Sequence, residues 1–236
     1  IKAATPGEDE EELLNEFGEP VEEFDIMGDP SAFAEGDGGA GSSSATPPPS
    51  LADGLDPATQ AIIAKSPTLQ KDLVELKAKD WTIVDGPAGG GCTANRDHKI
   101  ITLDSNLKGH PKETVQAIAH EVGHAQYDYK ADTSSKSAYL KGTLADEGAA
   151  TIKNIEVQRE ILANGGPDIK IAGSQANHAA YNAAYDQYRK DNNVAAAHDT
   201  IGGIFGKGER TSNTGQTYED YYGGSYDKWK ARANGK

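Results

Sequence analysis

The sequence predicts a mainly helical α+β domain over residues 56–236, with a small β-hairpin or sheet, behind a disordered acidic linker at residues 1–55. Long segments in the second half of the chain repeat apolar residues at helical spacing. Two short segments rich in β-branched residues come before them, on either side of a glycine-rich turn. The first 55 residues combine acidic runs with a Gly-, Ser- and Pro-rich stretch, which is typical of a linker.

The negative charge of the chain is concentrated in the predicted linker. The net charge is −14, but residues 1–55 hold 14 Asp and Glu against one Lys, whereas residues 56–236 hold 23 acids and 22 bases. A linker of this composition cannot bury enough apolar surface to fold by itself. Five of its apolar residues recur at helix-like intervals, which would allow a short helix to dock on a partner or on the folded domain: Leu13, Leu14, Phe17, Val21 and Phe24.

The composition also disfavours several classes of protein. The folded part has no run of Lys and Arg to neutralise phosphates, so we expect no nucleic-acid partner. No segment approaches the roughly 18 consecutive apolar residues of a membrane span. The single cysteine, Cys92, excludes an internal disulfide. Because the chain opens at Ile1 without a charged and then apolar leader, we expect a fragment or a processed product.

The predicted domain begins with two helices and two strands. Asp56-Pro57 is a helix-start signal, and residues 67–79 carry leucines at helical spacing. Residues 81–86 and 98–104 predict the two strands of a β-hairpin with a long, mobile glycine-rich loop. If the second of these strands is an edge strand, it could hold an extended peptide by strand addition.

The next segment predicts the helix around which the domain is organised. Pro111 suits the first turn of a helix, which should run to about Tyr129. Its apolar stripe includes Val115, Ile118 and Val122, at about 100° per residue. Two histidines fall on nearly the opposite side of this helix, so they do not simply fill the core.

These histidines belong to an H-E-x-x-H motif made of His120, Glu121 and His124. Residues four apart on a helix share one face, so both imidazoles can bind the same zinc ion. Glu121 is rotated away from that face and can act as a general base on a zinc-bound water. The motif therefore predicts one Zn2+ per chain and a hydrolytic reaction.

A catalytic zinc ion needs a third protein ligand, which we expect from the following helix, predicted over residues 137–164. Glu147 borders the apolar stripe of that helix. Gly148 and the two alanines after it leave little bulk, so the helix can pack close to the metal helix. We predict Glu147 as the third ligand, with Asp146 and Glu156 as the alternatives.

A further helix at about residues 174–194 and an aromatic-rich end complete the domain. The end of the chain is too polar and aromatic-rich for a simple core element, and it could fold back over the cleft. A tetrahedral intermediate would need a donor for its oxyanion. The candidate donors are the His and Tyr side chains of these two regions: His178, His198, Tyr218, Tyr221 and Tyr222.

Supporting residues around the site are predicted less sharply. Cys92, in the glycine-rich loop, could reach the zinc ion as an inhibitory thiolate or could be an incidental thiol. A carboxylate or another acceptor normally orients a metal-binding histidine through its second ring nitrogen. Asp128 and Asn154 are the candidates for this supporting role.

The sequence H-E-V-G-H, followed by Glu147 in D-E-G-A-A, resembles the gluzincin branch of the zincin metallopeptidases. A metzincin would carry a histidine where this chain has Lys130. Asp146, in G-T-x-x-D, is similar to the aspzincin ligand motif, but the Tyr-Gly that should follow is absent. The gluzincin resemblance implies a zincin-like fold and a zinc metallopeptidase that hydrolyses peptide bonds.

The layout of the chain also resembles the C-terminal metallopeptidase toxin modules of bacterial type VI secretion spike proteins. The acidic linker and the tail T-G-Q-T-Y-E-D-Y-Y-G-G carry this likeness. It implies a secreted effector, delivered into the periplasm or cytoplasm of a target cell, that cleaves protein or peptidoglycan peptide and meets a cognate immunity protein. The alternatives are an amidase for a small substrate and a zinc-stabilised, catalytically inactive binding module.

Overall fold

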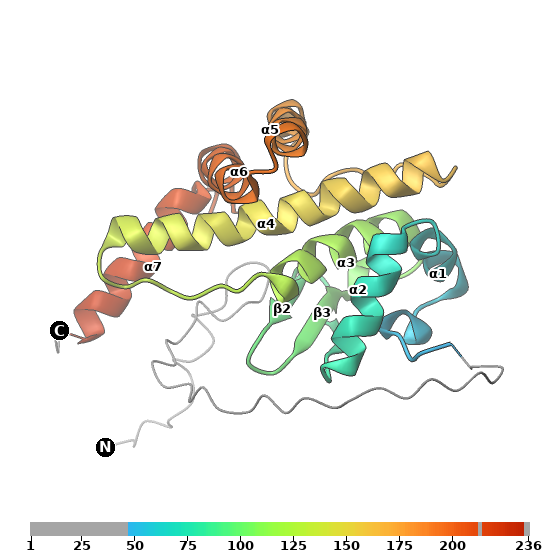
Figure 1. Cartoon of the computed structure of the whole chain (residues 1–236). Coiled ribbons are helices and arrows are strands. Elements are labelled where there is room, and N and C mark those ends of the chain that lie inside the picture. Colours follow the sequence, from blue (N-terminus) through green and yellow to red (C-terminus); the bar gives the residue numbers. More distant parts are fainter. Residues whose placement is uncertain (1–46, 212–213, 234–236) are drawn as a thin grey trace, which may run out of the picture.

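The computed structural model describes residues 47–211 and 214–233, and it confirms a mainly helical α+β fold with a small sheet. A long helix, α4 (Lys136–Ala163), runs through the middle of the domain (Figure 1). The elements before it are η2 (Leu51–Gly54), α1 (Pro57–Ile63), α2 (Pro67–Ala78), β1 (Thr82–Gly86), β2 (Thr93–Asn95), β3 (Ile100–Asp104), η3 (Ser105–Leu107) and α3 (Pro111–Gln126). The elements after it are η4 (Gln175–Asn177), α5 (His178–Asp191), α6 (Val194–Gly208) and α7 (Tyr218–Ala233).

Helix α4 separates two halves of the domain. The helices α1 to α3 and the sheet lie on one side of it, α5 and α6 lie on the other, and α7 crosses near its N-terminal end (Figure 1). Each half has its own cluster of buried apolar side chains. No helix in the described ranges is long and apolar enough to cross a lipid bilayer.

The folded region begins earlier than the predicted boundary at residue 56. Leu51 is 6% exposed and belongs to the core cluster of the first half. The Ser50 side chain caps η2 by accepting a hydrogen bond from the backbone N–H of Ala52. The predicted start signal of α1 is confirmed, because Asp56 accepts a hydrogen bond from the N–H of Thr59. Most of the predicted linker, with its apolar residues from Leu13 to Phe24, lies outside the described residues.

The sheet differs from the predicted hairpin. Its order is β1-β3-β2, with β1 parallel to β3 and β2 antiparallel to β3. The prediction that β1 and β3 form a hairpin was therefore wrong, since parallel strands need a crossover and this crossover contains β2. The strand at residues 98–104 is not an edge strand either, because β3 is the central strand. The edges of this three-stranded sheet are β1 and the short strand β2.

The two long helices that carry the site agree with the predicted ranges to within a few residues. Helix α3 ends at Gln126 rather than Tyr129, and α4 begins at Lys136. They approach each other closely at Gly123, where a Cβ atom would lie 2.5 Å from the Cα of Ala150. Gly148 instead faces α6, because a Cβ atom there would lie 2.2 Å from the carbonyl oxygen of His198. The small residues of α4 thus allow close packing against both α3 and α6.

The end of the chain contributes to the core, contrary to the prediction, but Tyr218 also lines a cleft, in agreement with the prediction that this segment folds back. Helix α7 buries Tyr218, Tyr222 and Tyr226, which lie one turn apart and pack in the core cluster of the second half. The predicted helix at residues 174–194 corresponds to η4 and α5, which ends where Asn192 adopts a left-handed conformation with φ of 56°. Rings of tyrosine supply much of the apolar surface here.

Candidate metal centre

The H-E-x-x-H histidines and Glu147 meet at the contact of α3 with α4. His120 and His124 project from one face of α3, and their Nε2 atoms each lie 3.5 Å from Oε2 of Glu147. The three side chains are almost completely buried, with 5%, 3% and 2% of their surfaces exposed. One ligand atom from each lies within 4.8 Å of the others, so the three residues are close enough to hold a metal ion.

These distances fit a metal ion better than direct hydrogen bonds. A hydrogen bond between imidazole and carboxylate would bring the two atoms to about 2.7–3.2 Å. Two ligands that each lie about 2.0–2.1 Å from a tetrahedral zinc ion are about 3.4 Å apart. Oε2 of Glu147 is buried and has no hydrogen-bond partner in the described part of the chain. A buried carboxylate oxygen of this kind calls for a cation.

The ionisation of the site suits metal binding. Burial lowers the pKa of His120, which keeps its imidazole neutral near pH 7 and able to donate a lone pair. Burial raises the pKa of Glu147, but the neighbouring His124 and His120 outweigh burial and hold that pKa well below its ordinary value. The site therefore combines a neutral imidazole at His120 with an ionised carboxylate at Glu147, which are forms that bind divalent metals.

Asp146 contacts His124 on the side of the imidazole that faces away from Glu147. Its Oδ1 lies 3.0 Å from Nδ1 of His124, on the ring nitrogen that points away from Glu147. Arg96 donates to the same Oδ1 at 2.6 Å and to the backbone carbonyl of His124 at 3.0 Å. This arrangement fixes the histidine ring and its tautomer, so Asp146 acts as the orienting carboxylate rather than as a ligand.

The residues predicted for this supporting role lie elsewhere. Asp128 is exposed, at 88% of its side chain, beside Lys130. Asn154 is buried but binds the backbone of residues 170 and 172 through its amide. Glu156, the other alternative for the third ligand, pairs with Lys153 at 3.5 Å. The contact of Arg96 with the site depends on packing between distant segments, so the sequence could not predict it. Asp146 was predicted only as an alternative metal ligand and not as the partner of His124.

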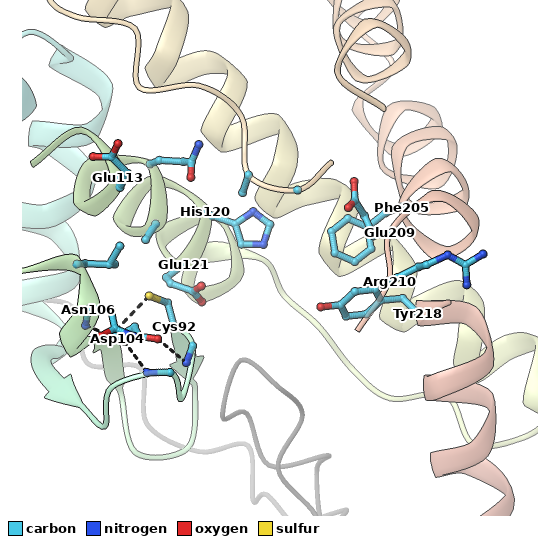
Figure 2. A pocket seen from close by; sticks show the side chains of 17 residues that line it. Cys92, Asp104, Asn106, Glu113, His120, Glu121, Phe205, Glu209, Arg210 and Tyr218 are labelled. Carbon is cyan, nitrogen blue, oxygen red and sulfur yellow. Dashed lines mark hydrogen bonds between the residues drawn. The ribbon is translucent and has the colours of Figure 1, made fainter. Parts of the chain in front are cut away.

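A cleft of about 470 Å³ opens beside the site. His120 and Glu121 project from α3 at its centre, and Figure 2 shows side chains of the first half of the domain facing those of the second half across it. One wall carries Cys92, Asp104 and Asn106, and the other carries Phe205, Glu209, Arg210 and Tyr218. Glu121 is 3% exposed and lines the cleft next to a metal-site histidine, which is the position that a general base requires.

Only one of the five predicted oxyanion donors lines this cleft within the described residues. That residue is Tyr218, from the first turn of α7. Tyr222 donates its hydroxyl to Oε1 of Glu147 at 2.7 Å. Tyr221 packs on these two tyrosine rings. The imidazole of His198 packs edge-on against Tyr127, and that of His178 lies beside Tyr181.

The glycine-rich segment forms part of the cleft wall and is held in place by Asp104. The carboxylate of Asp104 accepts hydrogen bonds from the N–H groups of Gly89 and Gly91. The N–H of Asp104 donates to Sγ of Cys92 at 3.3 Å. Burial raises the pKa of Cys92 to about 12, so its side chain is a neutral thiol near pH 7.

Comparison of the chain with protein-family models, with curated proteins and with solved structures found no match. The assignment of the site therefore depends on its own geometry and on the motif.

Proposed function

We propose that this chain is a zinc-dependent metallopeptidase. The observation that carries the proposal is the buried cluster of His120, His124 and Glu147, whose ligand atoms converge beside a cleft lined by Glu121. Three protein ligands and an open approach are the pattern of catalytic zinc sites, whereas structural zinc sites are usually closed by four protein ligands. The imidazole and carboxylate donors suit zinc among the common metals.

The residues of the chain have distinct roles in this proposal. Zinc, when bound, would polarise the scissile carbonyl group and lower the pKa of a water molecule to about 7. Glu121 would accept a proton from the attacking water and pass it to the leaving amine. Tyr218 lines the cleft and would donate a hydrogen bond to the oxyanion. Asp146 and Arg96 would hold His124 in the required orientation.

For the substrate we propose a peptide bond in a protein or in peptidoglycan, because the cleft lies at the junction of the two halves of the domain and is lined by residues of both. We propose further that the chain is a secreted toxin module. The resemblance of its layout to effector modules of type VI secretion supports this part of the proposal. A target-cell substrate and a cognate immunity protein follow from it.

The test is a comparison of Glu121→Gln with the wild-type protein. We expect the variant to keep about one zinc per chain, measured by elemental analysis, and to lose cleavage of protein and purified peptidoglycan. Glu156→Gln is the matched control, since it removes a carboxylate that lies outside the metal cluster, and it should behave as wild type. A Glu121→Gln protein with undiminished cleavage would reject the mechanism. A wild-type protein that binds zinc but cleaves nothing would favour the inactive binding module.

A further inference from the structure

The two oxygens of the Glu147 carboxylate have different environments. Oε2 faces Nε2 of both histidines. Oε1 accepts a hydrogen bond of 2.7 Å from the hydroxyl of Tyr222, which comes from α7 and lies 75 positions away in the sequence. Both residues are buried, with 2% and 4% of their surfaces exposed. The last helix of the described chain therefore touches the metal site directly.

We propose that Tyr222 is a positioning residue that makes α7 part of the metal centre. Its hydroxyl donates a hydrogen bond to Oε1, which leaves Oε2 of Glu147 as the oxygen that binds the ion. A hydrogen bond to an ionised carboxylate is shorter and stronger than one between neutral groups, and it holds the carboxylate in one rotamer. The inference rests on the metal-binding part of the proposed function and is independent of catalysis.

The neighbouring tyrosines show that this role differs from packing. Tyr218, Tyr222 and Tyr226 lie on one stripe of α7, and all three rings contribute to the same apolar cluster. The hydroxyl of Tyr226, however, donates to the carbonyl of Thr133, away from the metal cluster. Of these two hydroxyls, that of Tyr222 donates to the ligand carboxylate and that of Tyr226 does not. A change of Tyr to Phe removes the hydroxyl and keeps the ring, so the two roles can be separated.

The contact couples metal binding to the docking of α7. The carboxylate is held for the ion only while α7 is packed against α4. By thermodynamic reciprocity, an ion that fixes Glu147 must also stabilise the docked helix. Metal binding should therefore protect the backbone amides of α7, although no ligand of the predicted site lies on that helix.

The experiment compares Tyr222→Phe with the matched control Tyr226→Phe in the full chain. Zinc affinity is measured by competition with a chelator, and Co2+ is used as a spectroscopic probe. We expect Tyr222→Phe to bind zinc about 10–100-fold more weakly than wild type, and Tyr226→Phe to stay within about twofold. The visible absorption of the Co2+ form should weaken in Tyr222→Phe, because a freed Oε1 would add a ligand and raise the coordination number. Equal affinities for Tyr222→Phe and wild type would overturn the inference.

A measurement on the wild-type protein decides the case if Tyr222→Phe does not fold. Hydrogen exchange with and without zinc should show slower exchange in α7 when zinc is present, and unchanged exchange there would overturn the coupling. Failure of the inference is distinguishable from failure of the proposed function. If the wild type takes up no zinc, both fall. If Tyr222→Phe weakens zinc binding but Glu121→Gln leaves cleavage intact, only the catalytic proposal falls.

Discussion

Replacing Asp146 and Glu147 separately distinguishes a metal ligand from the residue that orients one. The two acids are adjacent in sequence and both buried, but they face different atoms of the site. Glu147 Oε2 lies 3.5 Å from Nε2 of both histidines, whereas Asp146 Oδ1 lies 3.0 Å from Nδ1 of His124. The amide variants Glu147→Gln and Asp146→Asn keep the shape of each side chain and remove its charge.

The expected losses of zinc affinity follow from these positions. Removing an orienting partner typically weakens metal binding about 10–100-fold, which corresponds to about 1.4–2.7 kcal/mol. We expect Asp146→Asn to fall in this range, because His124 keeps its place on α3 but loses its fixed tautomer. Glu147→Gln removes an anionic ligand and should lose more than about 100-fold.

The assay is a chelator competition at fixed pH, with elemental analysis of the purified proteins as a check. Circular dichroism of the metal-free variants establishes that both fold. The reasoning is refuted if Asp146→Asn loses the metal while Glu147→Gln retains it, because Asp146 would then be the ligand. Equal small losses in both variants would mean that neither carboxylate meets the ion.

Three further predictions concern the stability of the domain. A Cβ atom at Gly202 would lie 2.1 Å from a backbone oxygen of α4, whereas one at Gly203 would meet nothing within 4 Å. We therefore expect Gly202→Ala to lower the free energy of unfolding by about 1–3 kcal/mol or more. We expect Gly203→Ala to raise it by up to about 1 kcal/mol. Urea unfolding measures both, and similar effects at the two positions would contradict the packing of α4 against α6. Burial lowers the pKa of His120 from 6.5, so the unfolded chain binds a proton before the folded chain does as the pH falls. The metal-free protein should consequently lose up to about 1.4 kcal/mol per pH unit from this residue below about pH 6.5, and a flat profile between pH 7 and 5 would speak against a buried neutral imidazole. Deletion of residues 1–46 should leave the thermal midpoint unchanged, whereas a longer deletion that also removes Leu51 should cost about 1.5–3 kcal/mol; a large loss in the shorter deletion would show that the acidic segment docks on the domain.

Local patterns in the sequence carried the most reliable predictions. The range of α4 and the start of α3 were predicted to within a residue or two, because helical periodicity and capping signals act within a few residues. The common face of His120 and His124 follows from the same helical geometry. The segments that form β1 and β3 were also predicted from local patterns, but the pairing of the strands was not predicted correctly. Pairing depends on contacts between segments, which no single segment records.

The sequence by itself determined the mainly helical α+β class, the pair of histidines on one helix face with the adjacent Glu121, and the helix that follows with two candidate acids. The tertiary structure decided that Glu147 faces Nε2 of both histidines and that Asp146 contacts Nδ1 of His124. It also brought Arg96 and Tyr222 to the site from segments that the sequence does not connect with the motif. The physical reason is that a helix fixes the relative directions of its own side chains. The rotation and separation of two packed helices depend on the whole core between and around them.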